Sequence, residues 1–143
     1  MRYIVANVKG TLIGHGYPVL LQSMTNCSTN DIDAAVEQCT ALAGAGAGLI
    51  RMTTQGEREV ESLGKIKAIL RSRGIDTPLV ADIHFRSDVA ILAASVADKV
   101  RINPGNFARD PQKARTEFAR LLKICKERGT AVRIGINHGS LGS

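Results

Sequence analysis

Three arginines follow short apolar segments of this sequence, and they are the residues best suited to bind a ligand. Arg51, Arg101 and Arg133 each come directly after an apolar residue. Asn103 and Asn137 lie two and four residues beyond the second and third of these arginines. Residues two or four apart in an extended strand point to the same face, and guanidinium groups bind phosphate through paired hydrogen bonds. The sequence therefore predicts that these side chains gather around an anion about the size of a diphosphate.

The alternative interpretation is that each arginine forms an ion pair with a neighbouring carboxylate. Among the acidic residues, Asp82 alone has a comparable position near the end of an apolar segment. Buried charges need partners, and one carboxylate is too few for three guanidinium groups. We therefore favour anion binding for Arg51, Arg101 and Arg133.

Asp82 and His84 stand two residues apart at the end of another apolar segment. Asp82 could orient a hydroxyl group or an arginine, and His84 could bind phosphate or transfer a proton. Asp82 could equally be a helix cap or an ion-pair partner, with His84 an ordinary loop residue. These two are the candidates for catalysis, and both interpretations remain open.

Alternating strands and helices must position these residues. From residue 18 onward, apolar segments alternate with amphipathic ones, which predicts four βα units and a fifth strand. We expect strands at 19–23, 48–52, 79–82, 99–103 and 131–136, and helices at 32–43, 57–73, 87–96 and 111–128. Residues 1–17 predict a small N-terminal hairpin that caps one end of the sheet. We expect Ser87 to cap the third helix and residues 103–106 to form a tight turn.

This pattern predicts an α/β fold with a parallel sheet, because the strands are almost continuously apolar. An open doubly wound sheet and a partial (β/α)₈ barrel both fit. The sequence has no G-x-G-x-x-G after the first strand, and its polar residues follow four different strands, which favours the barrel. A TIM barrel takes about 250 residues, so this chain of 143 residues has room for about half of one.

Composition narrows the functional classes. The net charge is +6, but only 3% of residues are aromatic and no long basic block occurs, which argues against nucleic-acid binding. No apolar run reaches the roughly 20 residues of a membrane helix, and the N-terminus has no secretory signal, so we expect a cytoplasmic protein. Cys27, Cys39 and Cys125 have no metal-binding spacing. No metal site is therefore predicted within this chain.

Four motifs closely resemble those of the 4-hydroxy-3-methylbut-2-enyl diphosphate synthase family. They are the segments 21–26 (LQSMTN), 80–85 (VADIHF), 100–106 (VRINPGN) and 133–141 (RIGINHGSL). The resemblance covers essentially the whole chain, in order. It implies an enzyme of the non-mevalonate isoprenoid pathway that reductively opens 2-C-methyl-D-erythritol 2,4-cyclodiphosphate. The two electrons would come from ferredoxin or flavodoxin through a [4Fe-4S] cluster.

The resemblance also implies roles for individual residues. The substrate phosphates would be bound by Arg51, Arg101, Asn103, Arg133 and Asn137, with His138 close by. Asp82 and His84 map onto the same pocket. The family has an N-terminal barrel followed by a cluster domain, and none of the three cysteines matches a cluster ligand. We therefore expect the rest of the barrel and the cluster ligands to lie beyond residue 143, and this chain alone to be inactive.

Two other functions fit the residues. One is a phosphate- or pterin-binding barrel enzyme of the dihydropteroate synthase type, which has no metal cluster. The other is a non-catalytic anion-binding module made of half a barrel. Under all three functions, half a barrel leaves open sheet edges and an uncovered apolar face. We therefore expect a homo-oligomer.

Overall fold

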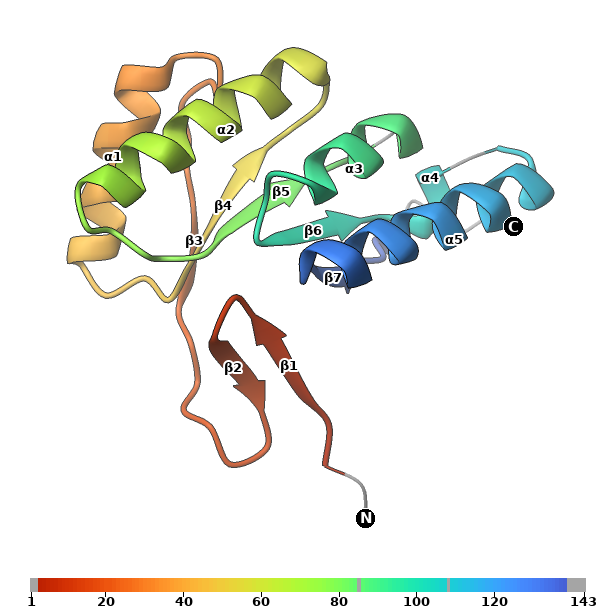
Figure 1. The fold of residues 1–143 in the computed structure, drawn as a ribbon, viewed down its shortest axis with the longest axis horizontal. Coiled ribbons are helices and arrows are strands. Elements are labelled where there is room, and N and C mark those ends of the chain that lie inside the picture. Colours follow the sequence, from red (N-terminus) through yellow and green to blue (C-terminus); the bar gives the residue numbers. More distant parts are fainter. Residues whose placement is uncertain (1–2, 85, 108, 139–143) are drawn as a thin grey trace.

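A five-stranded parallel sheet with helices on one side forms the body of the molecule. The computed structural model describes residues 3–84, 86–107 and 109–138. The sheet has the order β3-β4-β5-β6-β7, and its strands are β3 (Gln22–Met24), β4 (Leu49–Thr53), β5 (Leu79–Asp82), β6 (Lys99–Ile102) and β7 (Ala131–Ile134). In Figure 1 the helices follow one side of this curved row of strands. The predicted α/β fold, a partial barrel with alternating strands and helices, is confirmed.

Five helices accompany the sheet in the described residues. They are α1 (Ile32–Gly44), α2 (Glu57–Ser72), α3 (Ser87–Ala94), α4 (Pro104–Phe107) and α5 (Pro111–Arg128). Asp31 caps α1 by accepting a hydrogen bond from the Ala34 amide. Asp110 caps α5 in the same way, and Gly129 ends that helix in the left-handed conformation, with φ of 66°. Local capping signals therefore place the start of both helices and the end of α5.

Three local predictions were wrong. Ser87 is the first residue of α3 rather than its cap; Arg86 occupies the cap position and makes no capping hydrogen bond through its side chain. Residues 104–107 form one helical turn, α4, because Pro104 suits a first helical position and Asn103 accepts a hydrogen bond from the Gly105 amide. The first strand begins at Gln22 instead of residue 19, since it pairs with β4 only from Leu49 onward.

The two faces of the sheet have different chemistry. Ile50, Met52, Ala81, Val100 and Ile102 are fully or almost fully buried in the main core. Alternate residues on the same strands point the other way. On that inner face, Thr53, Asp82, Arg101 and Arg133 are successive partners across β4, β5, β6 and β7. A polar row therefore crosses the inner face near the carboxyl ends of the strands.

An N-terminal hairpin closes the opposite end of the sheet. Strands β1 (Val5–Val8) and β2 (Thr11–Gly14) pair antiparallel. Val8 is fully buried and forms a small cluster with Leu49 and Val80, which lie on β4 and β5. In Figure 1 the hairpin lies beside the starts of these strands. The predicted hairpin is therefore present, and it packs on the amino-terminal end of the sheet.

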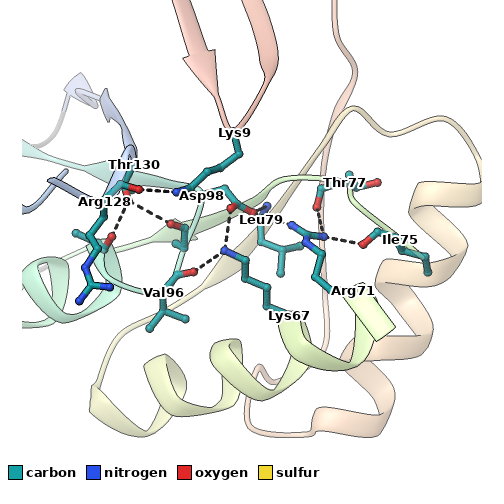
Figure 2. A network of polar contacts seen from close by, with 12 residues as sticks. Lys9, Lys67, Arg71, Ile75, Thr77, Leu79, Val96, Asp98, Arg128 and Thr130 are labelled. Atoms are coloured by element: carbon teal, nitrogen blue, oxygen red, sulfur yellow. Dashed lines mark hydrogen bonds and ion pairs between the residues drawn. The ribbon is translucent and has the colours of Figure 1, made fainter. Parts of the chain in front are cut away.

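The buried carboxylate of Asp98 links α2 to the amino-terminal end of the sheet. Asp98 is 2% exposed and accepts hydrogen bonds from Lys67 Nζ at 2.8 Å, Arg71 Nη2 at 3.0 Å and the Leu79 amide at 2.9 Å. Lys67 and Arg71 also donate to backbone carbonyl groups, as Figure 2 shows. One carboxylate thus joins the last turns of α2 to the start of β5.

The last strand is an open edge. Ile134 is 55% exposed and Ile136 is 58% exposed. Next to them, an apolar cavity of about 270 Å³ lies between β7 and α5, with Phe107 and Phe118 in its lining. Among the described residues, no helix is long and apolar enough to cross a membrane.

We predict that Asp98→Asn destabilises the fold. An asparagine side chain is uncharged and has one acceptor oxygen, so it cannot accept all three hydrogen bonds that Asp98 receives. The free energy of unfolding should therefore fall by about 1–3 kcal/mol. Urea unfolding followed by circular dichroism measures it. Asp88→Asn is the matched control, because Asp88 forms its ion pair with Arg86 at the surface. Equal unfolding midpoints for Asp98→Asn and the control would contradict the prediction.

Candidate anion-binding site

Asp82 is the centre of the polar row on the inner face. Its side chain is fully buried at the end of β5. Arg51 donates to Asp82 Oδ2 from Nε at 2.9 Å and from Nη2 at 2.5 Å. Arg101 Nη1 donates to Asp82 Oδ1 at 3.3 Å, and His84 Nε2 lies 3.5 Å from Oδ2. Two guanidinium groups therefore share one buried carboxylate.

Strand register explains this convergence. Asp82 and Arg101 are direct partners on β5 and β6. Arg51 is the partner of Val80, one inward-facing position before Asp82, and its long side chain reaches forward to the carboxylate. The interpretation that these arginines pair with a carboxylate is therefore correct for Arg51 and Arg101. One negative charge still leaves these two guanidinium groups with excess positive charge.

Further cations on the same face increase this excess. Arg133 is exposed on β7 and is the direct strand partner of Arg101. Like charges opposite one another on neighbouring strands destabilise a sheet. Lys99 precedes Arg101 by two residues, and its pKa is lowered by burial and, to a smaller degree, by the charge of Arg133. Lys99 and Arg133 both line a cavity of about 390 Å³ between the sheet and the hairpin. An anion at this face would relieve the repulsion.

Asn103 is almost completely buried just beyond β6, with 3% of its surface exposed. Its Oδ1 accepts a hydrogen bond from the Gly105 amide at 3.1 Å. The amide nitrogen is the hydrogen-bond donor of this side chain. The bond to Gly105 fixes which end of the side chain is the nitrogen.

Asn137 and His138 are exposed and follow the end of β7. In the part of the chain that the structure describes, the ion pairs of Asp82 involve Arg51, Arg101 and His84. The structure thus brings four of the predicted residues into one cluster, places Arg133 beside it, and leaves Asn137 and His138 at the surface. Residues 139–141 of the last motif lie outside the described residues.

Sequence reasoning missed two residues: Lys99, on the same face but toward the hairpin, and Gly135, beside Arg101. Lys99 has the same strand parity as Arg101, a signal that was present in the sequence. Gly135 contributes its carbonyl oxygen, which accepts a hydrogen bond from Arg101 Nη2 at 3.3 Å. A hydrogen bond from a side chain to a backbone carbonyl 34 residues away has no signature in side-chain spacing.

Cys39 and Cys125 are buried thiols on different helices, so these two are not placed together as ligands of one iron–sulfur cluster. Burial raises the pKa of the Cys39 thiol to about 11, with a smaller effect of Cys27, and burial also raises the pKa of Cys125. Cys39 lies on α1 and Cys125 on α5, at opposite ends of the row of helices in Figure 1. Within residues 3–84, 86–107 and 109–138, no group of three or more His, Cys, Asp or Glu side chains could hold a metal ion.

Known proteins are similar to this chain in sequence. Residues 4–143 match the family model of the GcpE TIM-barrel domain. The chain is 47% identical to a 4-hydroxy-3-methylbut-2-en-1-yl diphosphate synthase (flavodoxin) of Phocaeicola vulgatus, over 94% of this chain and 25% of that protein. It is 40% identical to the protein of the same name from Protochlamydia amoebophila, over 96% of this chain and 24% of that one. The chain spans about a quarter of the length of these relatives.

Solved structures show the same fold at lower sequence identity. 7,8-Dihydropteroate synthase from Vibrio fischeri superimposes with a TM-score of 0.61 at 18% identity, covering 90% of this chain and 47% of that one. Phospho-2-dehydro-3-deoxyheptonate aldolase from Thermotoga maritima gives 0.58 at 18% identity, over 93% and 44% of the two chains. Since the family model covers the sheet, the hairpin and the arginine cluster, the chain belongs to the 4-hydroxy-3-methylbut-2-en-1-yl diphosphate synthase family, through its GcpE TIM-barrel domain.

Proposed function

We propose that this chain is the substrate-binding part of an oxidoreductase that opens 2-C-methyl-D-erythritol 2,4-cyclodiphosphate to 4-hydroxy-3-methylbut-2-enyl diphosphate. The observation that carries the proposal is the shared carboxylate: Arg51 and Arg101 both depend on Asp82, and Arg133 and Lys99 add charge on the same face. The cluster also lies at the carboxyl ends of the strands, where TIM barrels bind their substrates.

The substrate diphosphate would be bound by the guanidinium groups of Arg51, Arg101 and Arg133. The amide nitrogens of Asn103 and Asn137 would donate further hydrogen bonds. The negative charges of a diphosphate would balance the positive charge that Asp82 leaves uncompensated. Hydrogen bonding and charge neutralisation would therefore both place the diphosphate beside these arginines.

His138 follows Asn137 and would lie close to the bound phosphates. Asp82 would act chiefly as a positioning residue, because its carboxylate is occupied by two arginines. His84 touches that carboxylate and is 31% exposed. We keep His84 in the proposal as a residue that would bind phosphate or transfer a proton beside the substrate.

The family resemblance further implies that a [4Fe-4S] cluster supplies two electrons, received from ferredoxin or flavodoxin. The relatives reported above carry flavodoxin in their names. The cysteines of this chain do not fit the cluster, so its ligands would come from elsewhere. We therefore expect the purified chain to bind substrate without reducing it, and turnover by this chain alone would contradict that expectation.

We propose that copies of this chain associate. The exposed Ile134 and Ile136 at the edge of the sheet provide an apolar surface for such contacts.

We also propose a cytoplasmic location, since the three cysteines are free thiols, as expected in a reducing compartment. The likeness to dihydropteroate synthase is one of fold alone, so no observation favours that activity.

Calorimetric titration of the purified chain with the cyclodiphosphate tests the binding proposal. We expect saturable binding that Arg133→Ala and Arg51→Ala each weaken by about 1.5–3 kcal/mol, the value of a hydrogen bond to a charged group. Arg73→Ala is the control, because Arg73 is exposed at the end of α2. Circular dichroism verifies folding. Absence of binding by the folded parent chain, or equal affinity for all variants, would refute the proposal.

The lowered pKa of Lys99 predicts a pH effect on stability. Burial and the charge of Arg133 keep the folded-state pKa below the ordinary value of 10.5, so a charged Lys99 opposes folding at neutral pH. This cost is relieved as the pH rises through the folded-state pKa. Lys99→Met should therefore resist urea better than the parent at pH 7, and the difference should shrink toward pH 10.

Lys123→Met is the control for this comparison, because Lys123 is exposed on α5. Its difference from the parent should stay constant with pH. A Lys99→Met chain that is less stable than the parent at pH 7, or a difference that does not change with pH, would contradict the prediction.

A further inference from the structure

Gly135 lies against the guanidinium group of Arg101. It follows β7, where its amide donates to the Ile102 carbonyl at 2.9 Å and its own carbonyl accepts from Arg101 Nη2 at 3.3 Å. A Cβ atom at Gly135 would lie 2.5 Å from Arg101 Nε, 3.0 Å from Nη2 and 3.1 Å from Cζ. The first of these distances is far below van der Waals contact. Arg101 therefore occupies the space that any larger residue at 135 would fill.

The backbone of Gly135 does not itself require glycine. Gly135 is not among the glycines with positive φ, so alanine can adopt its conformation. The conflict is with the far end of a flexible side chain rather than with backbone. A side chain at this position should therefore displace the guanidinium group and leave the fold intact.

The displacement would act directly on the anion site. Two hydrogen bonds hold the guanidinium group of Arg101. Its Nη1 donates to the Asp82 carboxylate, and its Nη2 donates to the Gly135 carbonyl. The arginine side chain is only 7% exposed, so it has little room to move while keeping both contacts. Moving it away from Gly135 would break at least one of the bonds that orient it.

We propose that Gly135 is a positioning residue for the anion site, and that its missing side chain sets the orientation of Arg101 toward a phosphate group. The inference rests on the proposed function for the identity of the anion. The contact between Gly135 and Arg101 stands independently of it. The two parts can therefore be tested separately.

A double-mutant cycle of Gly135→Ala and Arg101→Ala tests both parts. For binding, the probes are the cyclodiphosphate and inorganic pyrophosphate, titrated in a calorimeter. We expect Gly135→Ala to weaken binding at least about tenfold in the parent background, as for loss of a charged hydrogen-bonding partner. In the Arg101→Ala background the same change should matter less than about twofold, because the clash is gone.

Urea unfolding of the same four proteins tests the contact without any ligand. Gly135→Ala should lower the unfolding midpoint of the parent and leave that of Arg101→Ala unchanged. Gly64→Ala is the matched control, since a Cβ there meets Val96 at an ordinary 3.5 Å. The control should show no coupling to Arg101 in either measurement.

The outcomes are distinct. Unaltered binding by Gly135→Ala, or equal losses with and without Arg101, would overturn the positioning role. If the parent binds neither probe, the proposed function fails. The unfolding cycle then decides alone whether Gly135 positions Arg101: coupling supports the contact, and additivity refutes it.

Discussion

The burial of the Asp82 charge is the constraint on which the rest of the inner face depends. A carboxylate with no exposed surface must be paired, and here Arg51 and Arg101 both pair with it. Each contact comes from a neighbouring strand, so the charge balance requires the register of β4, β5 and β6. A shift of one residue in any of these strands would turn one partner toward the helices. The electrostatics and the strand pairing therefore support each other.

The two ends of the sheet differ in how their charged groups are paired. At the amino-terminal end, Asp98 joins α2 to β5 and the hairpin buries Val8 against Leu49 and Val80. These contacts are satisfied within the chain and serve stability. At the carboxyl end, Arg51 and Arg101 share the single negative charge of Asp82, and the diphosphate that we propose as ligand would supply further negative charge. The division agrees with barrels in general, where stability and substrate binding occupy opposite ends.

Arg101 and Arg133 are direct partners on neighbouring strands but differ in their surroundings. Arg101 is held by Asp82 and by the Gly135 carbonyl, whereas Arg133 is exposed beside it. Holding a guanidinium group in place before binding reduces the entropy lost when a phosphate arrives. The diphosphate that we propose as ligand carries two linked phosphates, which could contact both arginines.

Much of this protein was determined by local sequence alone. The apolar periods predicted every strand of the parallel sheet and four of the helices, because burial of one face is a local pattern. Strand parity placed Arg51, Arg101 and Arg133 on a common face. Parity says which way a side chain points but not which neighbour it meets. Only the packing of β4 to β7 decided that two arginines share Asp82 and that Gly135 lies against one of them, because both contacts join strands far apart in the sequence.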